Sequence, residues 1–221
     1  KKSTDRKSVQ EIYQNIKENA EISKNYVVLI LLASIVAAIG VLRNDVAVII
    51  GSMVIAPLIS PIMALSFATT LADSKLAKSS LTTGFLGFTI AIGIGIIFGL
   101  LFEVNVTNPQ IVARTEVSLL YILLALSAGV AGSLSITRDV SRALVGVMVA
   151  VALLPPLVII GLLVGSYHWI KALGATLLFL VYLVSLNLSG IVTFVFQGID
   201  PRQWWEKKKA RRFVRRAVVV W

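Results

Sequence analysis

Residues 51–61 read GSMVIAPLISP, and residues 146–156 read GVMVAVALLPP. The two stretches begin 95 residues apart, and each has two prolines near the middle of a long apolar segment. A proline removes a backbone donor and obstructs the carbonyl four residues earlier, so two close prolines can divide a helix. We therefore predict one proline-broken helix at each stretch.

The same offset of 95 residues aligns a wider part of the sequence. Without gaps it produces ten identities over the 36 positions 26–61, among them Tyr26 with Tyr121 and Arg43 with Arg138. Chance explains matches of Leu, Val and Ala, but matches of Tyr, Arg, Gly, Met and Pro in one register indicate a repeat. Each unit has three apolar segments, an odd number, so the second unit enters the membrane in the opposite direction. The sequence thus predicts an inverted pair with a pseudo-two-fold axis in the membrane plane.

Composition defines the class of protein. Apolar residues make up 57% of the chain and charged residues 14%, with a mean hydropathy of +0.88, whereas soluble domains carry about a quarter charged residues. The apolar runs approach the ~20 residues that cross ~30 Å of hydrocarbon. We predict an all-α integral membrane protein with about six transmembrane helices arranged as a 3+3 inverted repeat.

Basic residues orient the predicted spans. With the N-terminus in the cytosol, 18 of the 21 Lys and Arg residues lie on the cytosolic side, which favours cytosolic placement of both termini and an even number of spans. The expected order is a cytosolic amphipathic helix (1–25), a first three-helix repeat (26–102), an external loop (103–117), a second three-helix repeat (118–197) and a basic juxtamembrane helix (198–221). We expect this last helix to lead to a further C-terminal part.

The two broken helices predict a site for a solute. The second half of each would begin near the bilayer centre, where its N-terminus favours an anion or a carboxylate, as in transporters with paired discontinuous helices. The alternatives are simple proline kinks, and polar side chains that bond a neighbouring helix or their own backbone. The predicted substrate-binding residues are Ser52, Ala56, Pro57, Ser60, Pro61, Pro155, Pro156, Ser185, Asn187 and Ser189.

Several classes of function are disfavoured. No Asp, Glu, Lys or Arg lies well inside a predicted span, which argues against a proton pump and favours a facilitator, a channel or coupling through backbone carbonyls. The chain has no Cys and one His, His168, which excludes thiolate and His-rich metal sites. We predict no enzyme activity, no catalytic residue, no cofactor and no metal.

The basic C-terminal segment predicts contact with lipid. Aromatic and basic residues alternate there, and each charge near a membrane surface attracts anionic headgroups by roughly 1 kcal/mol. We expect anionic lipids as partners, no nucleic acid, and a homo-oligomer formed through small-residue helix faces. The predicted lipid-binding residues are Trp204, Trp205, Lys207, Lys208, Lys209, Arg211 and Arg212.

Asn44 and Asp45 followed by residues 51–61, and then residues 146–157, resemble the prokaryotic "uncharacterised hydrophobic domain" membrane family, domain of unknown function three-eight-nine. The resemblance covers about residues 8–196 and implies a bacterial or archaeal cytoplasmic membrane protein, often with added soluble parts. It implies no activity. Two hypotheses stay open: a transporter or channel for a small solute or ion, with an anion favoured, and a membrane-embedded signalling or scaffold module that acts through its cytosolic segments.

Overall fold

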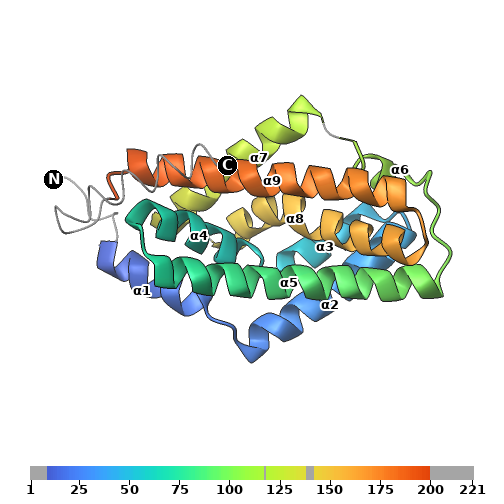
Figure 1. Cartoon of the computed structure of the whole chain (residues 1–221), viewed down its shortest axis with the longest axis horizontal. Coiled ribbons are helices and arrows are strands. Elements are labelled where there is room, and N and C mark those ends of the chain that lie inside the picture. The colour runs from blue at the N-terminus through green and yellow to red at the C-terminus, as the bar shows by residue number, and fades with distance from the viewer. Residues whose placement is uncertain (1–8, 117, 138–141, 200–221) are drawn as a thin grey trace.

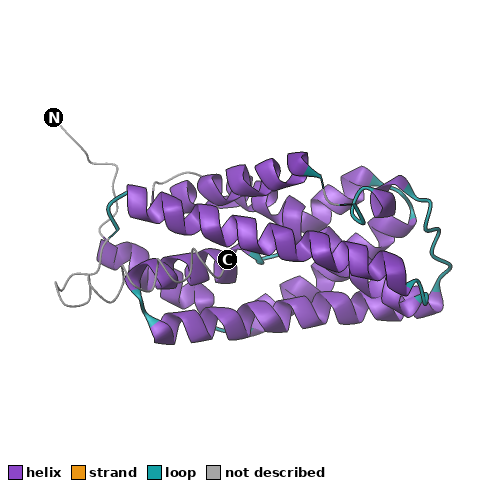
Figure 2. Cartoon of the chain, turned by 45° about the horizontal axis from the view of Figure 1, so that its top comes forward, coloured by secondary structure: helices purple, strands orange, loops and turns teal. Residues whose placement is uncertain are grey.

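The computed structural model describes residues 9–116, 118–137 and 142–199. All secondary structure in these ranges is helical (Figure 2). The helices are α1 (Val9–Ala20), α2 (Lys24–Leu42), α3 (Val46–Ile55), α4 (Ile59–Leu71), α5 (Ser74–Leu101), α6 (Pro109–Val112), α7 (Leu119–Thr137), α8 (Arg142–Gly165) and α9 (Trp169–Phe196). The prediction of an all-helical chain is confirmed for these residues.

Four helices in the described ranges, α2, α5, α7 and α9, are long and apolar enough to cross a membrane. The consecutive helices α3 and α4 meet the same criterion together, as one span bent by 53°. The chain is therefore a multi-pass membrane protein by length and composition. The predicted count of six is larger than these four or five, because the side chains of α8 are described only over Leu153–Gly165.

Polar side chains define where several helices begin. Ser23, Asp45 and Asp73 stand immediately before α2, α3 and α5, and each accepts a hydrogen bond from an amide of the first turn. These caps satisfy amides that have no acceptor inside their own helix. Asn44 (φ 55°) and Ala72 (φ 57°) adopt the left-handed conformation after α2 and α4, which permits the short turns into the next helices.

The helices form an elongated bundle with distinct ends (Figure 1). One end, the α1 end, holds α1 and the start of α5; the other, the α6 end, holds α6 and the start of α9. α5 runs from the α1 end to the α6 end, and α9 runs back. α8 contacts α2, α3, α4, α5, α7 and α9, so it is the central helix of the bundle.

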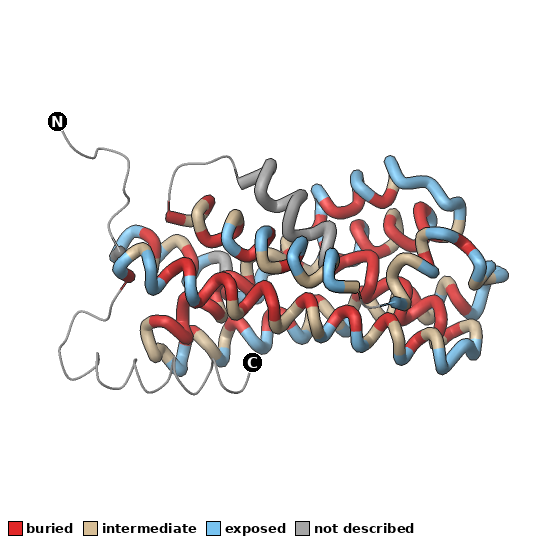
Figure 3. The backbone as a smooth tube through the Cα atoms, turned by 90° about the horizontal axis from the view of Figure 1, so that it is seen from above, coloured by how far each residue is buried: buried red, intermediate tan, exposed pale blue. Residues whose placement is uncertain are grey.

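Buried positions gather on the helix sides that face one another, and exposed positions gather outside (Figure 3). Large apolar side chains nevertheless lie on the outside, including Phe85 (72% exposed), Leu119 (78%) and Leu177 (59%). A water-soluble monomer rarely exposes contiguous apolar surface of this kind. The outer face of the bundle is thus suited to lipid.

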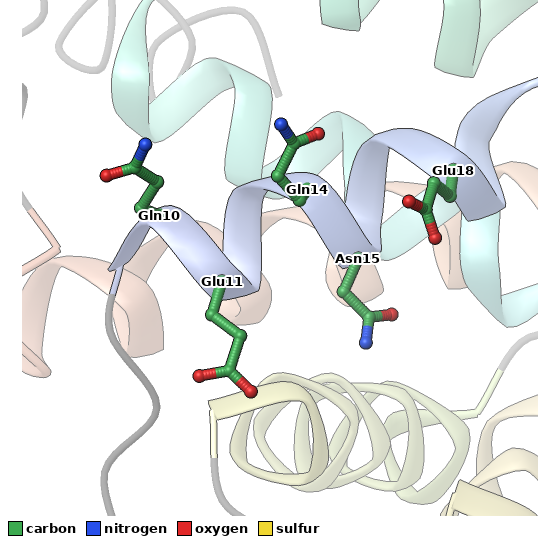
Figure 4. Close-up of a pocket in the computed structure, with 5 residues that line it drawn as sticks. All are labelled: Gln10, Glu11, Gln14, Asn15 and Glu18. Atoms are coloured by element: carbon green, nitrogen blue, oxygen red, sulfur yellow. The ribbon is translucent and has the colours of Figure 1, made fainter.

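The amphipathic helix predicted at the N-terminus is α1. Ile12, Ile16 and Ala20 are buried in one apolar cluster with residues of α4 and α5, among them Phe67 and Leu76. The opposite side of α1 is polar and lines a hollow of about 440 Å³. Figure 4 shows the lining residues, which are Gln10, Glu11, Gln14, Asn15 and Glu18.

A hydrogen bond joins α1 to the start of α5. The Tyr13 hydroxyl donates to Asp73 Oδ2 over 2.7 Å. Burial alone would raise the pKa of Asp73, but the hydrogen bonds from Tyr13 and from the amides of Leu76 and Lys75 outweigh it and lower that pKa below its usual 3.8. A lowered carboxyl pKa stabilises the folded state above about 3.8, and this stabilisation is lost as the pH falls through the lowered value.

We expect Asp73→Asn to loosen α1 and to remove this acid dependence, because Asn still caps α5 but is a neutral acceptor for Tyr13. The loss is about 1 kcal/mol, since hydrogen bonds to charged groups contribute modestly when partly exposed. The measurement is the hydrogen-exchange rate of the α1 amides in detergent, compared between pH 7 and about pH 3. Tyr13→Phe is the matched variant. Acid-dependent exchange that persists unchanged in both variants would show that another group is responsible.

Candidate functional site

A turn at residues 56–58 divides one apolar span into α3 and α4. Ala56 is extended (φ −73°, ψ 117°), the conformation that proline imposes on the residue before it. The Ala56 amide donates the last bond of α3 to the Ser52 carbonyl over 3.2 Å, and Pro57 has no amide with which to continue. The helices on either side are bent by 53°. The structure agrees with the predicted break at Pro57.

The start of α4 has no polar cap. Leu58 precedes the helix, and no side chain accepts a hydrogen bond from the first amides. The Ser60 hydroxyl, in this first turn, has no hydrogen-bond partner among the described residues. Pro61 fits the same turn, because a proline there forfeits no intrahelical bond. α4 thus presents amide donors and a partial positive charge midway along an apolar span.

Helix α5 closes one side of the break. A Cβ atom added to Gly87 would lie 3.1 Å from Leu58 Cδ2 and would collide with the Tyr26 hydroxyl, so only a glycine permits this approach. The Tyr26 hydroxyl donates to the Thr83 carbonyl over 3.0 Å. Since Leu58 is fully buried, the break is packed against α5 and has no opening on this side.

The second predicted break is wrong, because α8 continues as a helix through Pro155 and Pro156. The fixed proline φ suits a helix, and adjacent prolines leave unpaired carbonyls within a single turn. The surrounding helices hold this turn, since Leu153, Leu154 and Leu157 are all fully buried. At the α3–α4 turn the two prolines are four residues apart, so in a continuous helix the Pro61 ring would obstruct the Pro57 carbonyl. The spacing of the prolines therefore separates the two outcomes.

The predicted polar site residues behave in two ways. Ser52 and Ser189 donate to carbonyls of their own helices over 2.6 and 2.8 Å. Asn187 accepts a hydrogen bond from the Ser66 hydroxyl of α4 over 3.1 Å, which is the interhelical role given above as its alternative. The Ser185 hydroxyl, in contrast, has no partner among the described residues, although the residue is only 7% exposed.

By element, the predicted substrate-binding residues form three groups. They are Ser52, Ala56, Pro57, Ser60 and Pro61 at the α3–α4 turn, Pro155 and Pro156 in α8, and Ser185, Asn187 and Ser189 in α9. α8 contacts α3 and α9, and α9 contacts α4. One region of the bundle therefore contains all three groups, but the side-chain hydrogen bond from α9 to α4 goes to Ser66 and not to the turn.

Glycines bring α5 and α8 into direct backbone contact. Gly95 and Gly99 of α5 are four residues apart, and their partners on α8 are Gly161 and Leu162. A Cβ atom on Gly95 would lie 2.8 Å from Gly161 Cα, and one on Gly99 would lie 3.0 Å from Leu162 Cα. Gly161 and Gly165 of α8 have the same four-residue spacing, which is typical of close helix pairs.

A further pocket, of about 450 Å³, lies where the segment between α1 and α2 meets α5. Lys75, Lys78, Ser79 and Thr82 line it together with Glu21. Most of its surface is apolar, and Ile22 also lines it. The predicted lipid-binding residues Trp204, Trp205, Lys207, Lys208, Lys209, Arg211 and Arg212 lie outside the described residues.

These features define a class: a multi-pass helical membrane protein whose second span is interrupted by proline and whose central helix carries a proline pair. A family model described as "Domain of unknown function (DUF389)" matches residues 53–188. The chain belongs to this family, as its resemblance indicated. The matched range begins beside the α3–α4 turn and ends beside Asn187.

A curated relative extends the similarity to almost the whole chain. "Uncharacterized protein MJ0678" of Methanocaldococcus jannaschii is 41% identical over 212 residues, which are 96% of this chain and 66% of that protein. The chain thus spans a little under two thirds of the length of this relative. No solved structure matches the chain.

Proposed function

We propose that this chain is a membrane transporter or channel for a small solute or ion, without enzymatic activity, and that its route passes the α3–α4 turn. The observation that carries the proposal is the uncapped start of α4 midway along an apolar span. Lipid cannot satisfy free backbone groups, so irregular backbone at this depth is tolerated where it is enclosed by protein or lines a solvated route. Helix N-termini favour an anionic group.

We further infer that the chain is built from two three-helix units related by a pseudo-two-fold axis. Contacts in and just before the first unit have counterparts 95 residues later, in and just before the second. The pairs are Ala20–Ser79 with Thr115–Gly174, and Tyr26–Gly87 with Tyr121–Tyr182. These recurrences extend the register of the sequence repeat into α5 and α9.

Contacts between the units support the same axis, because they are reciprocal. If a residue of one unit touches a residue of the other, the residues 95 positions away touch as well, as a two-fold axis requires. The pairs are Ser66–Gly190 with Gly161–Gly95, and Phe67–Phe194 with Leu162–Gly99. α5 and α9 also run in opposite directions (Figure 1), as an inverted repeat demands.

The proposed route is closed in this structure. Leu58, Leu153 and Leu154 are fully buried, and α3 packs on α8. Passage of a solute therefore requires the two units to move relative to each other, as in transporters in which one repeat rocks against the other. The two-fold arrangement supplies a geometry for such movement, since exchanging the units exchanges the two ends of the bundle.

A scaffold or signalling module is the second candidate. The continuous α8 and the hydrogen bond between Ser66 and Asn187 favour it, because both are what a rigid, densely packed core requires. This candidate predicts a bundle without solute flux and a function in the cytosolic segments.

The proposal includes further expectations about location and partners. The basic residues favour the cytoplasmic membrane with both termini in the cytosol, so the α1 end would face the cytosol. Lys75 and Lys78, in the pocket beside α5, would then lie at the level of anionic headgroups. A homo-oligomer through lipid-facing small-residue surfaces is also expected.

Solute flux in proteoliposomes distinguishes the two candidates. Purified chain is reconstituted, and light scattering after an osmotic step follows the entry of chloride, acetate and phosphate, with sodium and potassium compared by a potential-sensitive dye. The proposal predicts entry of at least one solute above that of protein-free vesicles, with anions faster than cations. Vesicles as impermeable as the protein-free control for every solute would support the scaffold candidate instead.

A further inference from the structure

Arg114 is a partly buried cation in the segment between α6 and α7. Its Nη1 atom donates to both the backbone carbonyl and the side-chain Oε1 of Gln110, each over 2.9 Å. No carboxylate among the described residues pairs with it, and Glu116, two residues away, is exposed. Burial lowers the pKa of Arg114, although an arginine stays charged near neutral pH. An anion beside a partly buried cation stabilises its charged form.

Two tyrosines lie within electrostatic reach of the Arg114 guanidinium. Tyr121 of α7 and Tyr182 of α9 meet edge to face, with ring centroids 6.2 Å apart. Tyr182 is only 4% exposed, and neither hydroxyl has a hydrogen-bond partner among the described residues. Both hydroxyl oxygens are open to a ligand, because the one enclosed side-chain polar atom without a partner among the described residues is Gln197 Nε2. Two unpaired hydroxyl donors and an unpaired cation thus share one place in the fold.

The fold holds Arg114 at this place through its neighbours. The Thr115 carbonyl lies against Gly174 of α9, where a Cβ atom would collide with it. Lys171, one turn earlier on α9, donates from Nζ to the Val106 carbonyl over 2.9 Å. Because residues 174 and 182 are eight apart, they lie on one side of α9. The external segment is thereby fixed along the side of α9 that carries Tyr182.

This cluster is also where the two units differ. Ninety-five residues before Arg114 and Tyr182 the sequence has Asn19 and Gly87. The first unit therefore lacks both the cation and the second phenol, although it keeps Tyr26 in place of Tyr121. Packing contacts recur in both units, whereas these donors occur in one. Their arrangement is therefore an addition to the shared architecture.

We infer that Arg114, Tyr121 and Tyr182 form a binding site for an oxyanion, a phosphate or carboxylate group carried by a free solute or by a lipid headgroup. Gln110 engages only Nη1, so Nε and Nη2 keep the parallel donors that match two oxygens of such a group. The phenols add two O–H donors. An oxyanion has only hydrogen-bond acceptors, so it can accept a hydrogen bond from each unpaired donor of the cluster. The site lies apart from the proline turn, and binding there does not depend on transport.

Titration calorimetry of the purified chain in nanodiscs of neutral lipid tests the site, with inorganic phosphate and acetate as probes. Arg114→Gln is expected to weaken binding about tenfold or more, which corresponds to about 1.4 kcal/mol. Arg114→Lys keeps the charge without the paired donors, so an intermediate loss is expected. Arg43→Gln is the matched control, because Arg43 is an exposed arginine near the same end of the bundle, and we expect no more than about a twofold change.

A second arm separates the two sources of the anion. The first probe is a fluorescent phosphatidylglycerol in the same nanodiscs. If it binds, if Arg114→Gln abolishes this binding and if free phosphate does not displace it, the site takes a lipid headgroup. If free phosphate itself binds and its binding depends on Arg114, the site takes a solute. Tyr182→Phe keeps the ring packing and is expected to weaken the binding of either probe about threefold. This variant tests the site if Arg114→Gln fails to fold. No binding of any probe to the unmodified chain, or equal weakening in the Arg114 and Arg43 variants, overturns the inference.

Discussion

Gly161→Val is expected to prevent the chain from folding into this bundle. A Cβ atom at Gly161 would lie 2.7 Å from Gly95 Cα and 2.8 Å from the Ile96 amide nitrogen. These are backbone atoms of α5 and cannot turn aside as a side chain can. Forced overpacking usually costs 1–3 kcal/mol and more where nothing can relax, so we expect a loss of at least about 3 kcal/mol. The thermal midpoint and the monodisperse yield in detergent measure it.

Gly93→Val is the matched control on α5, because no atom lies within 4 Å of the position that its Cβ would occupy. It should fold like the unmodified chain, within about 1 kcal/mol. Gly190→Val tests the reciprocal contact and should cost less than Gly161→Val, since its nearest neighbour is the Ser66 side chain. A Gly161 variant as stable as the Gly93 variant would contradict the close α5–α8 contact.

Replacing Pro57 and Pro61 together by Ala is expected to lower solute flux about tenfold or more while the bundle still folds. The two alanines restore amide donors and remove the rings that obstruct the preceding turn, and a proline inside a helix costs about 3 kcal/mol. α3 and α4 can then approach one continuous helix, which withdraws the free amides at the start of α4. Proteoliposome flux, together with the thermal midpoint, checks both effects.

Pro109→Ala supplies the control for this variant. Pro109 is the first residue of α6, in the segment between α5 and α7. A proline at this position forfeits no hydrogen bond, so flux should not change. Pro155→Ala in α8 should have a smaller effect than the Pro57 and Pro61 pair, because α8 is already continuous. Unchanged flux in the double alanine variant would remove the α3–α4 turn from the route.

The break at Pro57 could be predicted because its cause is local. Pro57 and Pro61 are four residues apart, and their rings act on the same turn. The adjacent prolines of α8 looked equivalent in the sequence, but the outcome there depends on neighbours. Leu153 and Leu154 are enclosed on every side, and packing from several helices holds the turn together. Proline spacing was the local signal that separated the two cases.

The candidate site was predicted only in part, for a similar reason. Ser60 and Ser185 have no partner for their hydroxyls among the described residues, whereas Ser52, Asn187 and Ser189 form hydrogen bonds within or between helices. Hydropathy cannot separate these two roles, because it does not show which helix lies opposite. Arg114 and Tyr121 are near each other in the sequence, but Tyr182 belongs to α9, and no sequence pattern brought it to the other two.

The glycine contacts between the two proposed units could have been found from the 95-residue register. Gly95 and Gly190 occupy equivalent positions, and so do Ser66 and Gly161. A two-fold axis that pairs Ser66 with Gly190 must also pair Gly161 with Gly95. Small residues at all four positions were therefore a recognisable sign of an interface between the two units.

Cysteine labelling at Ser60 tests most directly whether the α3–α4 turn meets water. The chain has no cysteine, so each variant contributes a single thiol. In proteoliposomes, a membrane-impermeant methanethiosulfonate reagent should modify Ser60→Cys about tenfold faster than Val54→Cys, because thiolate forms in water and Val54, 57% exposed, faces lipid. Equal or undetectable labelling of the two variants would mean that no solvated route reaches the turn, and the transport proposal would be wrong.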